Sequence, residues 1–428
     1  KMKIAVVGSG ISGLGAALAL SEKHEVFLFE KNSYFGGHSN TVKIELKEET
    51  TYVDTGFIVF NEKNYPNLVG LFNELAVVTK CSNMSFGFSL DDGRLEYAGK
   101  NFNSFFAQRK NLLSIKHLRG LYDIFRFKKI AEKFMLSSKF QHFNMRQFLE
   151  QNHFGNWFSE MFIVPMGAAI WSVPTGNILD FPASSYLKFF QNHSLLDLIT
   201  TQIEWRTVDG GSKQYVDKII EKLGKSVFSE TPVKAITRKD KKCLLHAGNG
   251  FGEMIFDKVV LACDGPQTRE LIADITKEEE DILKMFKVSE NRVVLHSDET
   301  HMPKMKRVWS SWNFITDNLK NSIKKPIEVT YWMNKLQNIN SKNQYFVSLN
   351  PRKKIEPNLS YYETSYSHPI YDSNTLNAQT KLNAIQGNNG LYFAGAKMGF
   401  GFHEDGLNSG LKVAKLLGCE PSWSERKI

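Results

Sequence analysis

The residues best suited to chemistry near the start of the chain are three glycines and one acid. Gly8, Gly10 and Gly13 form a Gly-x-Gly-x-x-Gly pattern, and Glu30 follows seventeen residues after Gly13. Glycines at this spacing allow a tight turn, close approach of the backbone to a pyrophosphate, and close packing of a helix on a sheet. The later carboxylate can accept hydrogen bonds from ribose hydroxyls. The pattern predicts a dinucleotide site, and a ligand-free structural loop is the alternative.

Two strands and one helix must position these residues. Lys3–Val7 and Val26–Phe29 are short apolar runs, and Gly13–Ser21 between them is rich in Ala and Leu. The order predicts a strand, a glycine loop, a helix and a second strand that ends at Glu30. The N–H groups at the start of the helix would then face the phosphates. This context makes the motif more specific than glycines alone.

A second glycine pair follows soon after the acid, where a simple NAD domain would normally enter another helix. Gly36 and Gly37 are followed by His38. The arrangement resembles the FAD-dependent amine oxidase and phytoene desaturase superfamily, whose signature continues from the acid to Gly-Gly-Arg. His38 stands where arginine is usual, and this departure puts an amine substrate in doubt.

Two further segments resemble a narrower group. Asp54–Glu62 and Phe402–Gly410 look like bacterial predicted NAD/FAD-binding oxidoreductases that are often encoded near cyclopropane-fatty-acid synthase-like methyltransferases. Some members of that group are implicated in desaturating methylated fatty acyl chains. The resemblance therefore implies a hydrophobic, fatty-acyl or lipid substrate.

The resemblance also implies non-covalent FAD and a set of contacts to it. Val233 is expected to pair its backbone with adenine, and the N–H groups around Gly406 are expected to face the pyrimidine end of the flavin. Asp405 is expected either beside the flavin or as a plain helix cap. The residues expected at the cofactor are Gly8, Gly10, Ile11, Ser12, Gly13, Glu30, Lys31, Gly36, Gly37, His38, Val233, Gly395, Asp405, Gly406 and Leu407.

The expected fold is α/β with two discontinuous domains. A Rossmann-like FAD-binding domain of the GR2 type, with a β-meander, is predicted at residues 1–65, 205–285 and 385–428. The substrate-binding domain, α+β with a helical subdomain, is predicted at 66–204 and 286–384. Alternating residues predict four antiparallel strands in its second part: Arg292–His296, Val308–Phe314, Ile327–Met333 and Tyr345–Leu349.

Composition and cysteine spacing bear on whether the protein spans a membrane, binds a metal or forms disulfides. The 428 residues are 42% hydrophobic, with no apolar run near the roughly twenty residues of a membrane span. The four cysteines lie far apart without a Cys-x-x-Cys, so neither a metal site nor a disulfide is expected. The first strand begins at once, which leaves no room for a signal peptide. These features predict a cytoplasmic protein.

Positive charge gathers in one segment. Residues 101–140 hold nine Lys or Arg against two acids, a local balance of +7 out of a net charge of +9. Apolar residues recur there at helical spacing, so the segment reads either as a solvated helical face or as a surface that docks on an anionic membrane from its cytoplasmic side. No nucleic-acid motif accompanies the charge, so nucleic acid is not an expected partner.

Catalytic residues are hard to name when a flavin accepts the hydride. His38, His296 and His403 are candidates for a base or a flavin contact, with a structural role as the alternative for each. Lys397 is predicted either near the cofactor or on the surface. The candidates for the substrate wall are Trp171, Trp312 and Trp332, with core packing as the alternative for Trp171.

Three activities fit this sequence. The leading hypothesis is dehydrogenation of a lipid-like chain by an FAD-dependent oxidoreductase. The second is an amine oxidase that uses oxygen, which an aromatic cage with a lysine-held water would favour. The third is a redox-neutral, flavin-dependent isomerase, or a non-enzymatic flavoprotein whose bound FAD shows no net turnover. The electron acceptor stays open between oxygen, a quinone and another redox protein.

Overall fold

A parallel sheet of five strands carries one half of the molecule. The computed structural model describes residues 1–137, 142–192, 203–326 and 328–424. The strand order is β10-β2-β1-β14-β20, and every neighbouring pair is parallel. Parallel strands are buried on both faces, which explains why these runs are almost continuously apolar. Their bounds are β1 Lys3–Val7, β2 Glu25–Phe29, β10 Val227–Phe228, β14 Lys258–Leu261 and β20 Leu391–Phe393.

Helices cover one face of this sheet and a β-meander covers the other. Three helices, α1 (Ile11–Ser21), α10 (Lys213–Leu223) and α16 (His403–Leu416), share a core with β1 and β2. On the opposite face the antiparallel order is β11-β12-β13. The predicted α/β fold with a meander is confirmed. The meander strands are β11 Val233–Lys239, β12 Lys242–Ala247 and β13 Gly252–Phe256.

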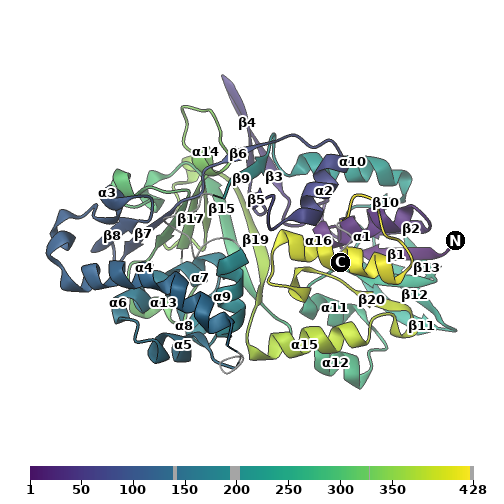
Figure 1. Cartoon of the computed structure of the whole chain (residues 1–428). Helices are drawn as coiled ribbons and strands as arrows, with labels where there is room; N and C mark the ends of the chain where they lie inside the picture. The colour runs from purple at the N-terminus through teal and green to yellow at the C-terminus, as the bar shows by residue number, and fades with distance from the viewer. Residues whose placement is uncertain (138–141, 193–202, 327, 425–428) are drawn as a thin grey trace.

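The second half is built on a mixed sheet of seven strands in the order β19-β15-β18-β17-β16-β7-β8. Figure 1 shows the long strands β15 and β19 running between the two halves, with helices α4, α7 and α9 over the second. Pairing is antiparallel except between β16 and β7. The bounds are β7 Phe86–Leu90, β8 Leu95–Ala98, β15 Lys287–His296, β16 Trp312–Ile315, β17 Glu328–Trp332, β18 Phe346–Leu349 and β19 Ser360–Ile370.

Helices pack on this sheet around an aromatic core that includes Phe127, Phe148, Phe158 and Phe190. The longest is α4, whose start is capped by the Ser114 side chain. The bounds are α3 Phe102–Phe105, α4 Ile115–Met135, α5 Met145–Gln151, α6 Asn156–Phe158, α7 Val164–Trp171, α8 Thr175–Leu179, α9 Ala183–Asn192, α13 Leu319–Ser322 and α14 Met333–Leu336.

Two small sheets and four more helices complete the described strands and α-helices. The hairpin β3–β4 projects from the molecule in Figure 1, and β5, β9 and β6 form a short sheet near α2. The bounds are β3 Thr41–Leu46, β4 Glu49–Asp54, β5 Phe60–Asn61, β6 Thr79–Ser82, β9 Trp205–Val208, α2 Pro66–Glu74, α11 Gly265–Leu271, α12 Lys277–Leu283 and α15 Ser373–Ala384.

Packing shifts some of the predicted boundaries. The prediction began the substrate domain at residue 66, yet α2 buries Leu68 and Leu71 in the core of the parallel-sheet half. Likewise α15 buries Ala378 and Leu382 beneath the meander side of that half. A helix whose apolar stripe faces one core belongs with that core, so these two helices extend the first domain.

One strand prediction needs correction, and one observed strand has no predicted counterpart. The run Val308–Phe314 is not one strand, because Lys306–Val308 is a 3-10 turn and β16 starts only at Trp312. The Asn313 side chain accepts from the Ser310 N–H and holds this bend. β19 was not predicted at all. Ile327 of the third predicted strand, and Lys139 and Phe140 of the basic segment, lie outside the described residues.

Candidate active site

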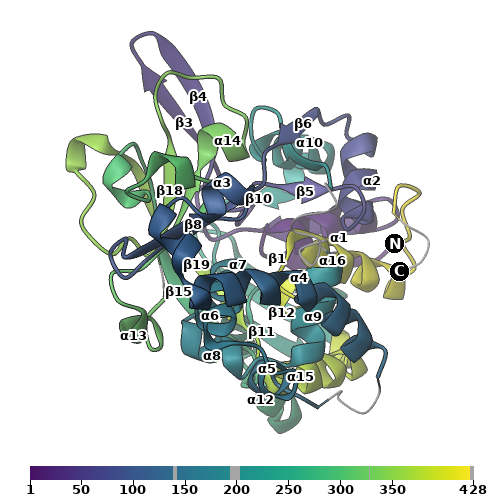
Figure 2. The ribbon, with the colours of Figure 1, turned by 60° about the vertical axis from the view of Figure 1, so that its left-hand side comes forward.

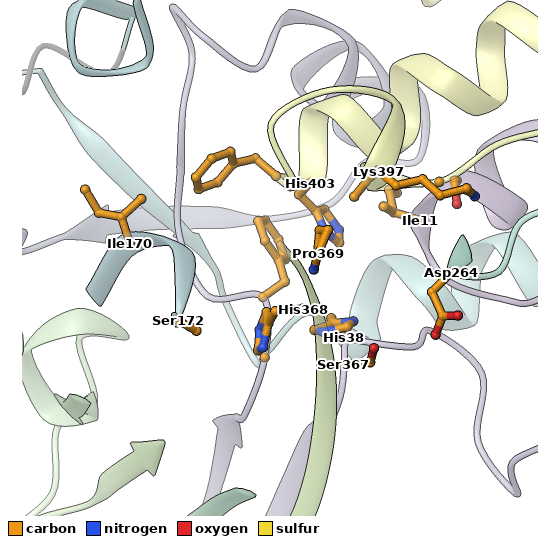
Figure 3. A pocket seen from close by; sticks show the side chains of 18 of the residues that line it. Ile11, His38, Ile170, Ser172, Asp264, Ser367, His368, Pro369, Lys397 and His403 are labelled. Carbon is orange, nitrogen blue, oxygen red and sulfur yellow. The ribbon is translucent and has the colours of Figure 1, made fainter. Parts of the chain in front are cut away.

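A cavity of about 340 Å³ lies where the two halves meet. One wall comes from the glycine loop and the carboxyl ends of β14 and β20, and the other from the seven-stranded sheet and the helices over it. In Figure 3, Ile170 and Ser172 lie on one side of the cavity and Lys397 and Asp264 on the other. The carboxyl ends of parallel strands are where α/β sheets bind their ligands.

The glycine loop has the geometry that its spacing predicts. Gly8 has φ +100°, and a Cβ there would lie 2.8 Å from the Ala262 carbonyl oxygen. A Cβ on Gly13 would lie 1.9 Å from the Gly8 carbonyl oxygen. On Gly10, by contrast, a Cβ would meet no atom within 4 Å, because this residue faces the cavity. The first and third glycines therefore serve the fold, and Gly10 leaves open space for a ligand such as a pyrophosphate.

The second glycine pair lies against this loop. A Cβ on Gly37 would lie 3.1 Å from the Gly10 Cα. The Gly36 N–H donates to the carbonyl and hydroxyl oxygens of Ser9 at 3.1 and 3.2 Å. Ile11, Ser12, Gly36 and His38 all line the cavity. Sequence reasoning thus grouped segments that the structure brings together.

Glu30 is buried at the end of β2, and its carboxylate already holds the glycine loop. One oxygen accepts from the Ser9 N–H at 3.1 Å and from the Ser9 hydroxyl at 2.6 Å. The other accepts from the Asn32 N–H at 2.8 Å. Each carboxylate oxygen has two acceptor positions, so the oxygen that accepts from Asn32 retains one position for a ribose hydroxyl. Lys31 is exposed, and Val233 opens β11 nearby in the meander.

The end of β20 forms the opposite lip of the cavity. Gly395 has φ +136°, and its N–H donates to the Ser409 hydroxyl at 2.8 Å. The buried Lys397 ammonium donates to the carbonyl oxygens of Cys263 at 2.6 Å and Ala394 at 2.5 Å. Burial lowers the pKa of Lys397 to about 8. Lys397 lines the cavity, which settles the choice between a cofactor-side and a surface position.

The helix after this lip begins before Gly406, whose N–H group was expected to face the flavin. α16 starts at His403, and the Gly406 N–H donates to the Phe402 carbonyl at 3.0 Å. Gly406 is therefore not a free donor, and Leu407 packs into the core where a Cβ on Gly15 would meet it. The unpaired N–H groups of a helix belong to its first turn. That correction moves the expected donors toward His403, whose side chain lines the cavity.

Asp405 organises the loop in front of this helix. Its carboxylate accepts from the N–H groups of Phe400 and Phe402, both at 3.0 Å. Burial raises the pKa of Asp405 to about 6. The neighbouring Glu404, whose pKa burial raises to about 7, accepts from the N–H groups of Asn67 and Leu68. Both acids hold backbone in place, so Asp405 does more than cap α16.

Three histidines meet in the cavity. The rings of His38 and His368 lie 5.2 Å apart, and His38 stacks on Tyr366 at 4.7 Å. The His403 ring stacks on Phe57 at 3.7 Å. Burial lowers the pKa of His38 to about 4 and of His368 to about 3, and it holds that of His403 well below its usual value. The cluster is therefore neutral at pH 7.

The three rings differ in how they are held. The Asn291 amide donates to His368 Nδ1 at 2.9 Å, which leaves the proton on Nε2. His403 Nε2 lies 2.8 Å from the Tyr215 hydroxyl. The His38 ring makes no hydrogen bond with any residue that the structure describes, although it lines the cavity. His38 is thus the histidine with the most chemical freedom.

His296 does not belong to this site. It is fully buried in the seven-stranded sheet, where Nε2 bonds the Ser348 hydroxyl at 2.8 Å and Nδ1 accepts from the Asp298 N–H at 3.0 Å. The prediction of a catalytic or flavin-contacting role for His296 is wrong, because both ring nitrogens are satisfied inside the sheet. Successive side chains of β15 point to opposite faces of the sheet, and the sequence alone does not show which face His296 takes.

The tryptophan predictions divide in the same way. Trp312 lines the cavity beside Tyr331. Trp171 is core, with its ring against Phe181 and Phe189, while its neighbours Ile170 and Ser172 line the cavity. Trp332 packs on Trp309 away from the cavity, so its substrate role is wrong.

Sequence reasoning missed His368 and the strand that carries it. Along β19 the Tyr362, Tyr366 and His368 side chains share one face, and the Asn40 amide donates to both tyrosine hydroxyls at 3.1 Å. The alternation of polar aromatic residues was the available signal. It was obscured because this face carries polar rather than apolar residues.

Comparisons with known proteins agree with this geometry. A family model described as flavin containing amine oxidoreductase matches residues 11–314. A 4,4'-diapophytoene desaturase from Staphylococcus aureus (strain Newman) is 54% identical over 43 residues, a match that spans 10% of this chain and 9% of the desaturase.

Solved structures share the fold across almost the whole chain. A CLA-producing fatty acid isomerase from P. acnes has a TM-score of 0.71 at 14% identity, with 98% of each chain covered. Cyclohexylamine oxidase from Brevibacterium oxydans IH-35A has a TM-score of 0.67 at 13% identity, with 97% of this chain and 99% of the oxidase covered. At these identities the likeness concerns the fold.

Proposed function

Because the chain belongs to the flavin containing amine oxidoreductase family, we propose that it dehydrogenates a hydrophobic, fatty-acyl or lipid substrate. Family membership makes the protein an FAD-dependent oxidoreductase. The observation that carries the substrate class is the apolar wall that faces the cofactor end of the cavity. Its members are Ile58, Val59, Met84, Phe86, Ile170, Phe189, Trp312 and Tyr331.

The residues present fit FAD. The open space above Gly10 suits the pyrophosphate, Glu30 suits a ribose, and the Gly395 lip and the start of α16 flank the space left for the flavin. Bound FAD supplies the hydride acceptor. The side chains of this protein therefore have three tasks, which are to orient the substrate, exclude water and handle the proton.

An amine substrate finds little support in the cavity. Among the described lining residues, Asp264 carries the one carboxylate, and that group caps α11 by accepting from the Gln267 N–H at 2.8 Å. Trp312 and Tyr331 meet edge to face at 4.8 Å, which leaves no gap between parallel rings for a cationic amine. The Lys397 ammonium already donates two hydrogen bonds to backbone carbonyls. An uncharged chain suits these walls better.

His38 is the residue that we assign to the proton. Removal of hydride from one carbon is completed by loss of a proton from its neighbour, and a neutral imidazole can accept that proton. Burial keeps His38 neutral, and its ring nitrogens are not held by any described side chain. His368, with the proton on Nε2, packs against this ring at 5.2 Å, and the nearby His403 is held by Tyr215.

A redox-neutral isomerisation is the second candidate. It is favoured by the similarity of the whole fold to the CLA-producing fatty acid isomerase. The same apolar wall and the same neutral His38 would serve it, because moving a double bond also requires a proton to leave one carbon and return to another.

Product masses separate these possibilities. The holoenzyme would be incubated with fatty acyl phospholipids, free fatty acids and a panel of amines, each with oxygen or a quinone. A lipid product that has lost one pair of hydrogens supports dehydrogenation. An unchanged mass with a moved double bond supports isomerisation and overturns dehydrogenation. A carbonyl product from an amine overturns both lipid activities.

A further inference from the structure

An exposed apolar row runs along the outer side of α4 and the turn before it. Leu113 is 90% exposed and Ile115 84% exposed. The outer α4 face consists of Leu112, Leu113, Ile115, Leu118, Tyr122 and Phe125. Isolated exposed apolar residues are ordinary, but a contiguous row on one helix marks an interaction surface.

Helical spacing places these side chains on one face. Ile115, Leu118, Tyr122 and Phe125 follow one another at steps of three and four residues, while His117, Asp123 and Phe127 point to the protein core. The helix is therefore anchored on one side and apolar on the side that faces outward. Figure 2 brings α4 forward, with α6, α7 and α9 beside it.

Exposed cations flank the apolar row. Lys110, Lys116, Lys129 and Lys133 are all exposed. Arg119 and Arg126 differ from them, because both pair with the buried Asp123 carboxylate and Arg126 also donates to the Asn152 carbonyl at 2.7 Å. The exposed lysines thus remain available to a partner, whereas the two arginines fasten the helix.

We propose that the outer α4 face docks on an anionic phospholipid bilayer. Large apolar side chains with lysines beside them match the two parts of such a surface, acyl chains and negative headgroups. Within the described residues, no helix is both long and apolar enough to cross a membrane. Docking therefore depends on side chains that enter the interface.

The docked face lies one helix layer from the cavity. Phe127 on the inner side of α4 packs on Phe190 of α9 at 6.2 Å. The adjacent Phe189 lines the cavity and stacks on Phe402 at 4.4 Å. Docking would hold the helical cover of the cavity against the membrane. The proposal rests on surface residues, so it can fail while the proposed substrate class holds.

Vesicle co-sedimentation of the full FAD-bound chain tests the proposal. Vesicles of phosphatidylcholine alone are compared with vesicles that contain about one third phosphatidylglycerol. We expect at least about 25-fold tighter binding to the anionic vesicles, weakened by added salt. Equal binding to both vesicle types, or no binding to either, would overturn the proposal.

Two double variants separate the contributions. Lys129→Gln with Lys133→Gln should weaken anionic-vesicle binding about 25-fold, since each lysine near such a surface contributes about a factor of five. Leu113→Ser with Ile115→Ser should weaken it about tenfold or more. The matched controls are Lys47→Gln with Lys225→Gln, and Val78→Ser with Ile255→Ser. These four residues are exposed elsewhere on the protein, so both control variants should leave vesicle binding unchanged.

Retained flavin absorbance and an unchanged thermal midpoint show that each variant is folded. If the serine variant is unstable, the glutamine variant still decides the test, because exposed lysines do not support the core. Size-exclusion chromatography completes the experiment. A serine variant that changes the oligomeric state and leaves vesicle binding unchanged would overturn membrane docking and make this face a contact between copies of the chain.

Discussion

At Gly10, an added Cβ should impair cofactor binding without disturbing the fold. The residue starts α1 with an ordinary negative φ, and a Cβ there would enter the open cavity. Gly8 and Gly13 lack this property, because a Cβ on either would collide with backbone. The three glycines of one motif therefore have different roles.

We expect Gly10→Ala to weaken FAD retention at least about tenfold while the free energy of unfolding of the apoprotein changes by less than about 1 kcal/mol. Flavin absorbance after gel filtration and urea denaturation of the apoprotein measure the two effects. Gly99→Ala is the matched control, since a Cβ there also meets no atom within 4 Å but lies on the surface. Equal FAD retention by both variants would contradict the assignment.

His296 provides a pH test that does not involve the site. Burial lowers its pKa to about 3, from an ordinary value of about 6.5. Because the pKa is lower in the native protein, His296 of the unfolded chain binds a proton at pH values at which native His296 stays neutral. The stabilising contribution is therefore complete above about pH 6.5 and is lost as pH falls toward 3.

His296→Gln removes this titration while keeping a donor and an acceptor. We expect the variant to be about 1 to 2 kcal/mol less stable at about pH 7, since its amide cannot match both ring bonds. By about pH 5 the difference in stability between the variant and the wild type should shrink by about 2 kcal/mol. Only the wild type loses this stability, because its unfolded chain binds a proton at His296. A deficit that stays constant across this range would show that His296 is not held neutral.

At the scale of elements, the contact between α1 and α16 decides how the cofactor end is built. A Cβ on Gly410 would lie 2.2 Å from the Ser12 carbonyl oxygen, and one on Gly406 would lie 2.8 Å from an Ile11 methyl carbon. The two helices approach this closely because glycines lie at the contact, where any side chain would collide with the other helix. The lip at Gly395 and the glycine loop are held together by this contact.

Gly410→Ala should therefore destabilise the protein by about 1 to 3 kcal/mol, the usual cost of an overpacked contact. In an unrestricted helix the same change would stabilise by up to about 1 kcal/mol, so the sign alone identifies the contact. Chemical denaturation measures it. Lys412→Ala, on the exposed side of the same helix, is the control and should be near neutral. A stabilised Gly410→Ala variant would refute tight packing.

The sequence predicted the parallel-sheet half best, because its glycines, apolar strands and meander each have strong local signals. α16 starts earlier than the sequence predicts, since Phe402 has no side-chain acceptor for a cap and Asp405 resembles one. β19 was missed because its cavity face carries Tyr366 and His368 rather than apolar residues.

At the scale of the whole molecule, the site exists only because distant segments meet. The glycine loop, His38, Ile170, Trp312 and His368 come from five separate stretches of chain, yet all line one cavity or its rim. Sequence motifs located the cofactor wall. The substrate wall depends on which face of the sheet each strand residue occupies. Trp312 lies in the cavity, whereas Trp332 faces away from it.

The central claim is that an uncharged lipid chain, held by the apolar wall, gives up hydride in this cavity. The most direct measurement is anaerobic: the purified holoenzyme is mixed with fatty acyl phospholipids or with amines, without any electron acceptor, and its flavin absorbance is followed. We predict stoichiometric bleaching by the lipid and none by the amines. Bleaching by an amine alone, or an unchanged flavin beside a lipid whose double bond has moved, would contradict the claim.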